Sequence, residues 1–192
     1  STSDQTPDIK GELPGPESQK LFEQTEKFQY GSYFQMVNSL PVAFTRGEGV
    51  TLIDADDNRY LDFTQGHMVA GLGHGHPRLA KAIADQAHQL MNVRDFPTDK
   101  RVGLMERLAK ITPGNLNVFQ FFNAGTEATE AAMRVARAAT GKHEFVSIAG
   151  DYHGRTTSAI GTSMGNQASG PRPSGFMTLP GAFCYRCEHK MT

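Results

Sequence analysis

The sequence predicts an α/β fold built around a parallel sheet. Residues 118–122 form a short apolar run of the kind found in buried strands, and residues 145–149 form another. Between them, residues 126–139 repeat small apolar side chains at helical spacing. Strand, helix and strand in this order predict a βαβ unit, in which two parallel strands are joined by a right-handed crossover.

The composition fits a globular domain and excludes several classes of protein. A chain of 192 residues with 38% hydrophobic residues can bury a core without disulfides. Residues 1–96 hold 8 basic and 13 acidic side chains, whereas residues 97–192 hold 11 and 7. The basic excess of the second half suits a small anionic ligand, but it is far from the dense Lys and Arg stripe that nucleic acid requires. Two cysteines are too few for a secreted disulfide framework.

Nothing in the sequence indicates a membrane protein. No run of 18 or more apolar residues is present, so we expect no membrane span. Residues 1–20 are polar and rich in Pro and Gly, without the charged and then apolar layout of a signal peptide. The sequence therefore predicts a soluble, cytoplasmic protein.

The N-terminal part is expected to contain an extended lead-in, a helix and a β-hairpin. Residues 1–16 are interrupted by Pro and Gly, and residues 17–29 place apolar side chains at helical spacing. Residues 50–54 and 60–63 have the character of strands and flank the turn Asp56-Asp57-Asn58. Because Asp and Asn tolerate positive φ, this turn favours a hairpin.

Two helices are predicted in the middle of the chain. Pro77 stands at the first-turn position of one of them, and Asp99 to Ile111 forms the other, which Pro113-Gly114 ends. The first helix is expected to bury one apolar stripe, consisting of Leu79, Ile83, Ala87, Leu90 and Met91.

The glycine-rich segment before Pro77 allows two functional interpretations, neither of which is favoured. Gly71-Leu-Gly73-His-Gly75 lacks the G-x-G-x-x-G spacing of a dinucleotide-binding loop, and no convincing strand precedes it. His74 and His76 lack an acidic or Cys partner at metal-ligand spacing, which favours loop and cap roles over metal binding.

The helix at residues 126–139 carries a directional charge pattern. Glu127 and Glu130 lie in its N-terminal half, with Arg134 and Arg137 toward its C-terminus, as the helix dipole prefers, and Gly141 ends it. We interpret the two Glu residues as solvated, with Arg134 spaced for an i, i+4 pair, rather than as a catalytic dyad. The face expected to be buried consists of Ala128, Ala131, Ala132, Val135 and Ala139.

Two turns at the ends of the predicted strands could bind a ligand. The turn Asn123-Ala124-Gly125-Thr126 leads into a helix, where unpaired N–H groups and the positive end of the dipole favour an anion. Tyr152-His153-Gly154 follows the next strand, so both turns would open onto one crevice. An aromatic ring beside a phosphate cradle indicates a planar heteroaromatic phosphate ester. The alternatives are that Thr126 only caps its helix and that Tyr152 only anchors its loop.

Several motifs together resemble the class III aminotransferases, over roughly residues 30–160 and in the family's order. They are Asp54-Ala-Asp-Asp-Asn-Arg-Tyr-Leu-Asp-Phe63, Gly73-His-Gly-His-Pro77, Phe122-Asn-Ala-Gly-Thr-Glu-Ala-Thr-Glu130, Thr140-Gly141-Lys142 and Asp151-Tyr-His-Gly-Arg-Thr156. The last motif and Cys184-Tyr-Arg-Cys187 are more similar to the 4-aminobutyrate aminotransferase-like branch than to the glutamate-semialdehyde aminomutases.

The resemblance implies a fold and a cofactor. The fold is that of the aspartate-aminotransferase type (fold type I), here an incomplete three-layer α/β domain with a predominantly parallel sheet. Residues 1–65 would be an N-terminal lead-in, helix and hairpin, and residues 66–192 the first part of the large cofactor-binding domain. Such a piece is expected to expose sheet edges and apolar helix faces. The cofactor is pyridoxal 5'-phosphate.

The resemblance also assigns site residues. The backbone of Gly125 and Thr126 would hold the cofactor phosphate, Tyr152 would stack on the pyridine ring, and His153 would lie beside it. The segment from Thr64 to Val69, with Thr64, Gln65 and Val69, would line the substrate pocket. Ala124 stands where the family usually has serine, which leaves the backbone cradle in place.

The reaction implied is transfer of an amino group between an amine or ω-amino acid and a 2-oxo acid, by a homodimer with a shared active site. Alternatives are racemisation or decarboxylation of amino acids, or a non-catalytic fragment. In this family the Schiff-base lysine lies well downstream of the Tyr-His-Gly motif, and we expect it beyond Thr192, because none of the eight lysines has the family's context. This chain alone is therefore predicted to be inactive.

The two cysteines complete the candidate chemistry. Cys184-x-x-Cys187 with His189 is at most half of a zinc knuckle, whereas a tetrahedral site needs four ligands. We expect reduced thiols and no metal.

Overall fold

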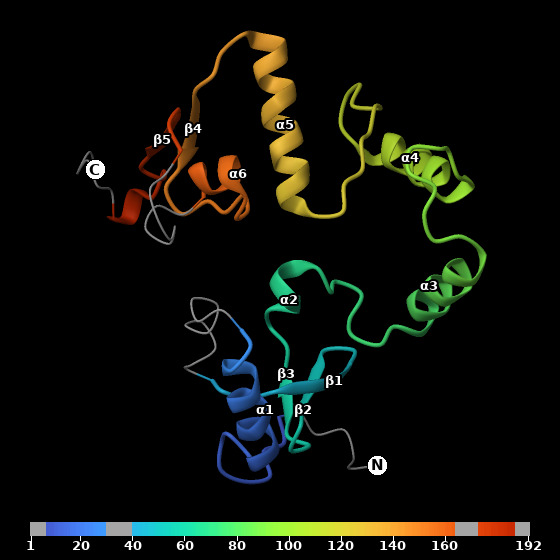
Figure 1. Cartoon of the computed structure of the whole chain (residues 1–192), viewed down its shortest axis with the longest axis vertical. Helices are drawn as coiled ribbons and strands as arrows, with labels where there is room; N and C mark the ends of the chain where they lie inside the picture. Colours follow the sequence, from blue (N-terminus) through green and yellow to red (C-terminus); the bar gives the residue numbers. More distant parts are fainter. Residues whose placement is uncertain (1–6, 30–39, 164–172, 187–192) are drawn as a thin grey trace. The chain divides into compact units, whose positions relative to one another are not determined.

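The computed structural model describes residues 7–29, 40–163 and 173–186. The chain divides into two compact units, residues 1–96 and residues 97–192, whose elements are labelled in Figure 1. Among the described residues, no helix has both the length and the apolar character needed to cross a bilayer.

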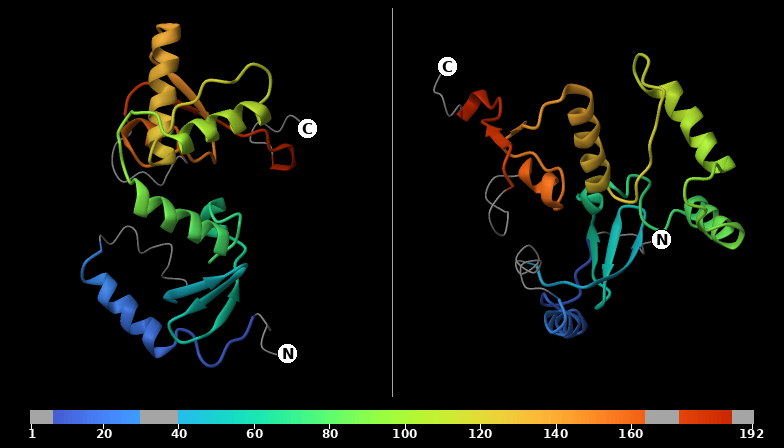
Figure 2. Two further views of the ribbon diagram at one scale, coloured as in Figure 1. Left: turned by 90° about the vertical axis from the view of Figure 1, so that its right-hand side faces the viewer. Right: turned by 45° about the horizontal axis from the view of Figure 1, so that its top comes forward.

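The first unit contains an antiparallel sheet of three strands in the order β1-β2-β3 (Figures 1 and 2). The strands are β1 (Phe44–Glu48), β2 (Thr51–Asp54) and β3 (Arg59–Leu61). β2 and β3 form the predicted hairpin, with Ile53 paired to Arg59, and Asp57 in the turn has a φ of 61°. The prediction of the hairpin is confirmed. β1 was not predicted, because its sequence shows no apolar alternation.

A buried carboxylate organises the hairpin turn. Asp54 is 1% exposed, and its oxygens accept from the N–H groups of Asp56 and Asn58, the Asn58 amide and the Tyr60 hydroxyl, at 2.8–2.9 Å. Burial by itself raises the pKa of Asp54, but the hydrogen bonds from Asn58 and Tyr60 outweigh it, so the pKa lies below its usual value. The turn is therefore fixed by a fully satisfied buried acid.

The hairpin turn also caps α1 (Pro16–Glu26). The side chain of Asp56 accepts hydrogen bonds from the N–H groups of Glu17 and Ser18, each at 2.9 Å. A Cβ atom on Gly15 would lie 2.3 Å from Asp56 Cγ, so only glycine allows this approach. The helix thus receives its N-terminal acceptor from 38 or 39 residues away in sequence.

Two helices follow in the first unit, α2 (Gln65–Met68) and α3 (Pro77–Gln89). His76 caps α3, since its side chain accepts from the N–H of Leu79 at 3.4 Å, which confirms its predicted cap role. The apolar stripe of α3 is not buried, contrary to the prediction: Leu79 is 45% and Ile83 is 61% exposed. An amphipathic face is buried only where another surface meets it, and no described residue covers this one.

The second unit contains helices and a parallel pair of strands. Its helices are α4 (Asp99–Ile111), α5 (Gly125–Thr140) and α6 (Thr157–Gly161), followed by the 3₁₀ turn η3 (Cys184–Arg186). β4 (Phe145–Ile148) and β5 (Phe176–Leu179) pair in parallel, with Phe145 opposite Phe176 and Ile148 opposite Leu179. α4 and α5 occur within one residue of their predicted bounds, and Gly141 ends α5 with a φ of 68°.

The predicted strand at residues 118–122 is wrong. This segment pairs with no strand in the described part of the chain, and Val118 is 91% exposed. The parallel pair is instead β4 with β5, a strand that was not predicted. A strand requires a neighbour for its backbone groups, and that neighbour cannot be read from a local pattern.

The buried face of α5 differs from the predicted one. Of the five predicted residues only Ala131 is buried, whereas Val135 is 68% exposed and Met133 is buried instead. The covered side faces β4 and β5, where the guanidinium carbon of Arg137 lies 5.0 Å from the ring centre of Phe145. The rings of Phe145 and Phe176 stack at 5.8 Å. This aromatic pair and Arg137 therefore join the C-terminal half of α5 to the sheet.

Candidate functional site

The N-terminus of α5 has no side-chain cap. Its N-cap residue is Ala124, in extended conformation, and alanine offers no acceptor to the first N–H groups of the helix. The N–H of Asn123, just before the helix, donates to the carboxylate of Glu127 at 2.9 Å. In contrast, α3 and α4 each begin with a side-chain cap. The first turn of α5 thus combines N–H donors with the positive end of a 16-residue helix, a donor set that suits an anion.

Thr126 does not cap this helix, because it is the second helical residue and its hydroxyl points elsewhere. Thr126 Oγ1 lies 2.8 Å from Thr156 Oγ1, and Thr156 in turn donates to Glu130 Oε1 at 2.7 Å. Since the only hydroxyl proton of Thr156 is used toward Glu130, Thr126 is the donor to Thr156. The hydroxyl proton of Thr126 is therefore engaged, and its backbone N–H is the group that an anion would meet.

Gly154 brings the loop after β4 against the first turn of α5. Its φ is +131°, and a Cβ atom at this position would lie 2.2 Å from Thr126 Oγ1. Only glycine accommodates both the backbone conformation and the contact. The predicted anion-binding turn and the Tyr152-His153-Gly154 loop consequently lie side by side.

Tyr152 has an exposed ring in this loop. The residue is 62% exposed, and no hydrogen bond ties its hydroxyl to any described residue. An anchoring role does not fit this exposure. Its neighbour His153 is held through the backbone, since its N–H donates to Ser163 Oγ at 3.0 Å, and its Nε2 lies 3.7 Å from Asp151 Oδ2.

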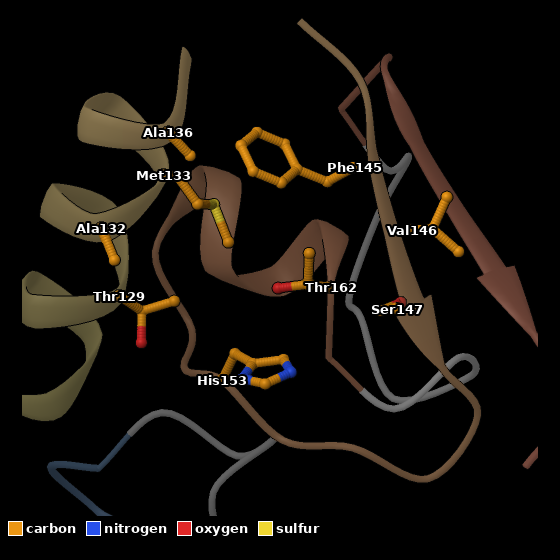
Figure 3. Close-up of a pocket in the computed structure, with 9 residues that line it drawn as sticks. All are labelled: Thr129, Ala132, Met133, Ala136, Phe145, Val146, Ser147, His153 and Thr162. Carbon is orange, nitrogen blue, oxygen red and sulfur yellow. The ribbon is translucent and has the colours of Figure 1, made fainter. Parts of the chain in front are cut away.

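His153 also lines a pocket between α5 and β4, drawn in Figure 3. The pocket has a volume of about 300 Å³, with His153 at one end and the ring of Phe145 at the other. The remaining lining residues are small or apolar apart from three hydroxyl groups: Thr129, Ala132, Met133, Ala136, Val146, Ser147 and Thr162.

The role of Glu130 was missed by the sequence analysis. Glu130 forms no ion pair with Arg134 among the described residues. Its Oε1 instead accepts from the hydroxyl of Thr156 at 2.7 Å. The same oxygen accepts from the N–H groups of Ser158 and Ala159, at 2.9 and 3.2 Å. The hydrogen bond from Thr156 is the main cause that lowers the pKa of Glu130. No local pattern signals this role, because the three donors to Glu130 lie 26–29 residues away in sequence.

The predicted substrate-pocket residues Thr64, Gln65 and Val69 belong to the first unit and are exposed. Gln65, His67 and Met68 have φ values of 50°, 60° and 67°, so α2 is a left-handed turn that is strained at each of them. Asp62 stabilises the start of this turn by hydrogen bonds. Its Oδ1 accepts from the N–H and the hydroxyl of Thr64 and from the N–H of Gln65, each at 2.9 Å.

Asp62 is itself fixed by a histidine. His74 Nε2 lies 2.7 Å from Asp62 Oδ2, and the carboxylate side chain is 4% exposed. This hydrogen bond, followed by those from Thr64, holds the pKa of Asp62 well below its usual range. His74 therefore has the loop role that the sequence predicted.

The described residues contain no group of three or more His, Cys, Asp or Glu side chains arranged to hold a metal. Cys184 is an exposed free thiol. Cys187 and His189 lie outside the described residues, so the cysteine pair stays a prediction.

Comparison with known proteins identifies the relatives of this chain. The sequence model of one family, Aminotransferase class-III, matches residues 33–186. Acetylornithine aminotransferase 1 of Bordetella parapertussis is 38% identical over 150 residues, which cover 73% of this chain and 38% of that protein. Isoleucine 2-epimerase of Lentilactobacillus buchneri is 33% identical over 178 residues, which cover 84% of this chain and 39% of that protein.

A solved structure has the same fold. It is an (S)-enantioselective omega-transaminase from Thermomicrobium roseum, with 28% identity and a TM-score of 0.76 over 91% of this chain and 42% of that one. This likeness confirms the predicted fold class. The chain spans about two fifths of the length of the relatives it matches. With the family match extending over most of the sequence, the chain belongs to the class III aminotransferases.

Proposed function

We propose that the whole protein is a pyridoxal-phosphate-dependent aminotransferase, which moves an amino group between an amine or ω-amino acid of the 4-aminobutyrate type and a 2-oxo acid. The observation that carries this proposal is the uncapped first turn of α5 with the Tyr152 loop held directly against it. The aminotransferase and the transaminase among the relatives support the same reaction class.

The residues present fit the phosphate and the ring of this cofactor. The N–H groups of Gly125 and Thr126 would hold the phosphate at the positive end of the helix dipole. The exposed ring of Tyr152 would lie against the pyridine ring, with His153 beside it. When bound, the cofactor supplies an electron sink for the reacting carbon of the substrate, and the protein supplies orientation and charge.

We propose that residues of the first unit bind the substrate. Thr64, Gln65 and Val69 would line the pocket, and Asp62 would hold the backbone of the first two in place. We further propose a homodimer with a shared active site, a cytoplasmic location, and the division of the whole protein into an N-terminal segment of residues 1–65 and a large domain that begins at residue 66.

A binding experiment with pyridoxamine phosphate tests the cofactor site. This compound has no aldehyde, so it cannot react with the lysines of the chain. Gly125→Pro removes one N–H donor from the first turn of α5. Proline is tolerated at this first helical position, because Ala124 before it has extended backbone. A Cβ atom at residue 125 also meets no atom within 4 Å. Gly125→Ala keeps the donor and is the matched control.

We expect Gly125→Pro to lower the affinity by roughly tenfold to hundredfold, as the loss of one hydrogen bond to a charged group implies, and Gly125→Ala to leave it nearly unchanged. Calorimetric titration gives both values, with phosphate-free pyridoxamine as the ligand control. Equal affinities for the two variants would contradict a phosphate site at this turn.

The second candidate function is racemisation of an amino acid. It is favoured by the isoleucine 2-epimerase among the relatives. The whole protein supplied with one enantiomer of an amino acid and no 2-oxo acid would invert that enantiomer if it is an epimerase. An aminotransferase would need the 2-oxo acid to turn over, so chiral chromatography with and without acceptor separates the two reactions.

A further inference from the structure

The proposed cofactor site is assembled from two segments that are distant in sequence. The first turn of α5 would supply the phosphate donors, and the loop at residues 151–156 would supply the aromatic ring. Thr126 and Tyr152 are 26 residues apart in sequence, so something must fix the position of one segment relative to the other. Glu130, one turn into α5, makes the contacts that do this.

A continuous chain of hydrogen bonds runs from the first turn of α5 to the end of the loop. The hydroxyl of Thr126 donates to Thr156 Oγ1 at 2.8 Å, and Thr156 donates to Glu130 Oε1 at 2.7 Å. This chain of hydrogen bonds begins at Thr126 and ends at Glu130, and both residues are neighbours on one face of α5. Thr156 is therefore clamped between two side chains of a rigid element, two residues after Gly154.

The same carboxylate begins the helix that follows the loop. Thr156 is the N-cap of α6 but makes no side-chain cap of its own, because its hydroxyl is turned toward Glu130. The N–H groups of Ser158 and Ala159 donate to Glu130 Oε1 instead. One carboxylate oxygen thus receives three donors from the loop and α6, and these bonds lower the pKa of Glu130, so it is ionised near neutral pH.

We propose that Glu130 is a positioning residue, which fixes the loop carrying Tyr152 relative to the phosphate-binding turn of α5. The inference rests on the proposed function, since it concerns the placement of the proposed ring-stacking residue. The hydrogen bonds of Glu130 are to the loop and α6, and Glu130 is not among the residues proposed to hold the cofactor. It determines where the ring of Tyr152 lies once the phosphate is held.

Two probes separate this role from a general structural one. Inorganic phosphate needs only the turn of α5, whereas pyridoxamine phosphate needs the turn and the ring of Tyr152. In the 192-residue chain we expect Glu130→Ala to lower the affinity for pyridoxamine phosphate about tenfold, the size typical of one lost ring-stacking contact. The affinity for inorganic phosphate should stay within about twofold.

Two further variants refine the test. Glu130→Gln keeps an acceptor oxygen and should restore most of the affinity for pyridoxamine phosphate. In a Tyr152→Ala background, Glu130→Ala should have no further effect, because the contact through which Glu130 acts is already gone. Circular dichroism and urea unfolding verify that each variant is folded.

Several outcomes would overturn the inference. They are an equal loss of affinity for both probes, no loss for either, or additive effects of Glu130→Ala and Tyr152→Ala. If Glu130→Ala does not fold, Thr156→Val provides the test, because it is nearly isosteric and removes the hydroxyl between Thr126 and Glu130. We expect this variant to lower the affinity for pyridoxamine phosphate about threefold. An unchanged affinity would overturn the proposal. Failure of the unmodified chain to bind pyridoxamine phosphate would instead contradict the proposed function.

Discussion

At the scale of single residues, Gly154 shows how one backbone position holds a site together. It is buried, has a φ that side chains disfavour, and leaves no space for a Cβ beside Thr126. The loop after β4 can approach α5 only because this residue is glycine. A side chain here must either move Thr126 or push the loop, and Tyr152 with it, away from the helix.

Gly154→Ala should therefore destabilise the chain by about 2 kcal/mol or more, from backbone strain and overpacking together. Gly103→Ala in α4 is the matched control, because a Cβ there meets no atom within 4 Å. Removing a glycine from a helix interior should stabilise the chain by about 0.5–1 kcal/mol. Urea unfolding measures both changes. Similar free energies of unfolding for the two variants would mean that the Gly154 contact is not a constraint.

At the scale of elements, the left-handed turn α2 depends on a side chain outside it. Thr64 and Gln65 donate to Asp62, and His74 holds the opposite oxygen of this carboxylate. Asp62→Asn replaces a charged acceptor by a neutral amide, so the hydrogen bonds that this side chain makes with Thr64, Gln65 and His74 are weakened. We expect faster hydrogen exchange of the amides at residues 64–69, while Asp85→Asn in an exposed pair on α3 leaves them unchanged.

The same turn should respond to acid. The pKa of Asp62 is lower in the folded chain than its unfolded value of about 4. Its stabilising contacts are therefore fully present above pH 4 and are lost as the pH falls through the lower folded value. Exchange protection at residues 64–69, corrected for intrinsic rates, should decrease in this acidic range. Protection that is constant with pH, or that falls on raising the pH toward 8, would contradict the role of Asp62.

The helix α3 gives a second test at this scale, because its apolar stripe is exposed. Ile83→Lys should change the free energy of unfolding by less than about 0.5 kcal/mol, since the side chain is 61% exposed and covers no core. Ile53→Ala in β2, where the side chain is 3% exposed, should cost about 2–5 kcal/mol. Urea unfolding of both variants distinguishes the covered position from the uncovered one. A large loss from Ile83→Lys would mean that this face packs on part of the chain.

The success of the sequence-based predictions depended on how local each feature is. The hairpin around Asp57 and the bounds of α5 follow from turn chemistry, periodicity and caps, all contained in a few neighbouring residues. The strand at residues 118–122 and the buried stripe of α3 depend on partner surfaces far along the chain. Glu130 was misassigned for the same reason, because its partners Thr156, Ser158 and Ala159 lie 26–29 residues away.

At the scale of the whole molecule, we expect the predicted site to need one chemical group from another part of the protein. The residues proposed to bind the cofactor only hold and orient it, whereas amino transfer needs a lysine that moves a proton at the reacting carbon. We expect that none of the eight lysines of this sequence is the Schiff-base lysine. We therefore expect the 192-residue chain to bind the cofactor without catalysing amino transfer.

We expect the chain to bind pyridoxamine phosphate but not to transfer its amino group to a 2-oxo acid faster than the reaction in free solution. Absorbance spectroscopy follows loss of the amine form of the cofactor, and chromatography detects the amino acid formed. The Gly125→Pro variant sets the background with weakened site binding, because it loses one phosphate contact and leaves every lysine in place. Amino-acid formation above that background would show that a lysine of this chain reaches the reacting carbon, and the assignment of the catalytic lysine to another part of the protein would then be wrong.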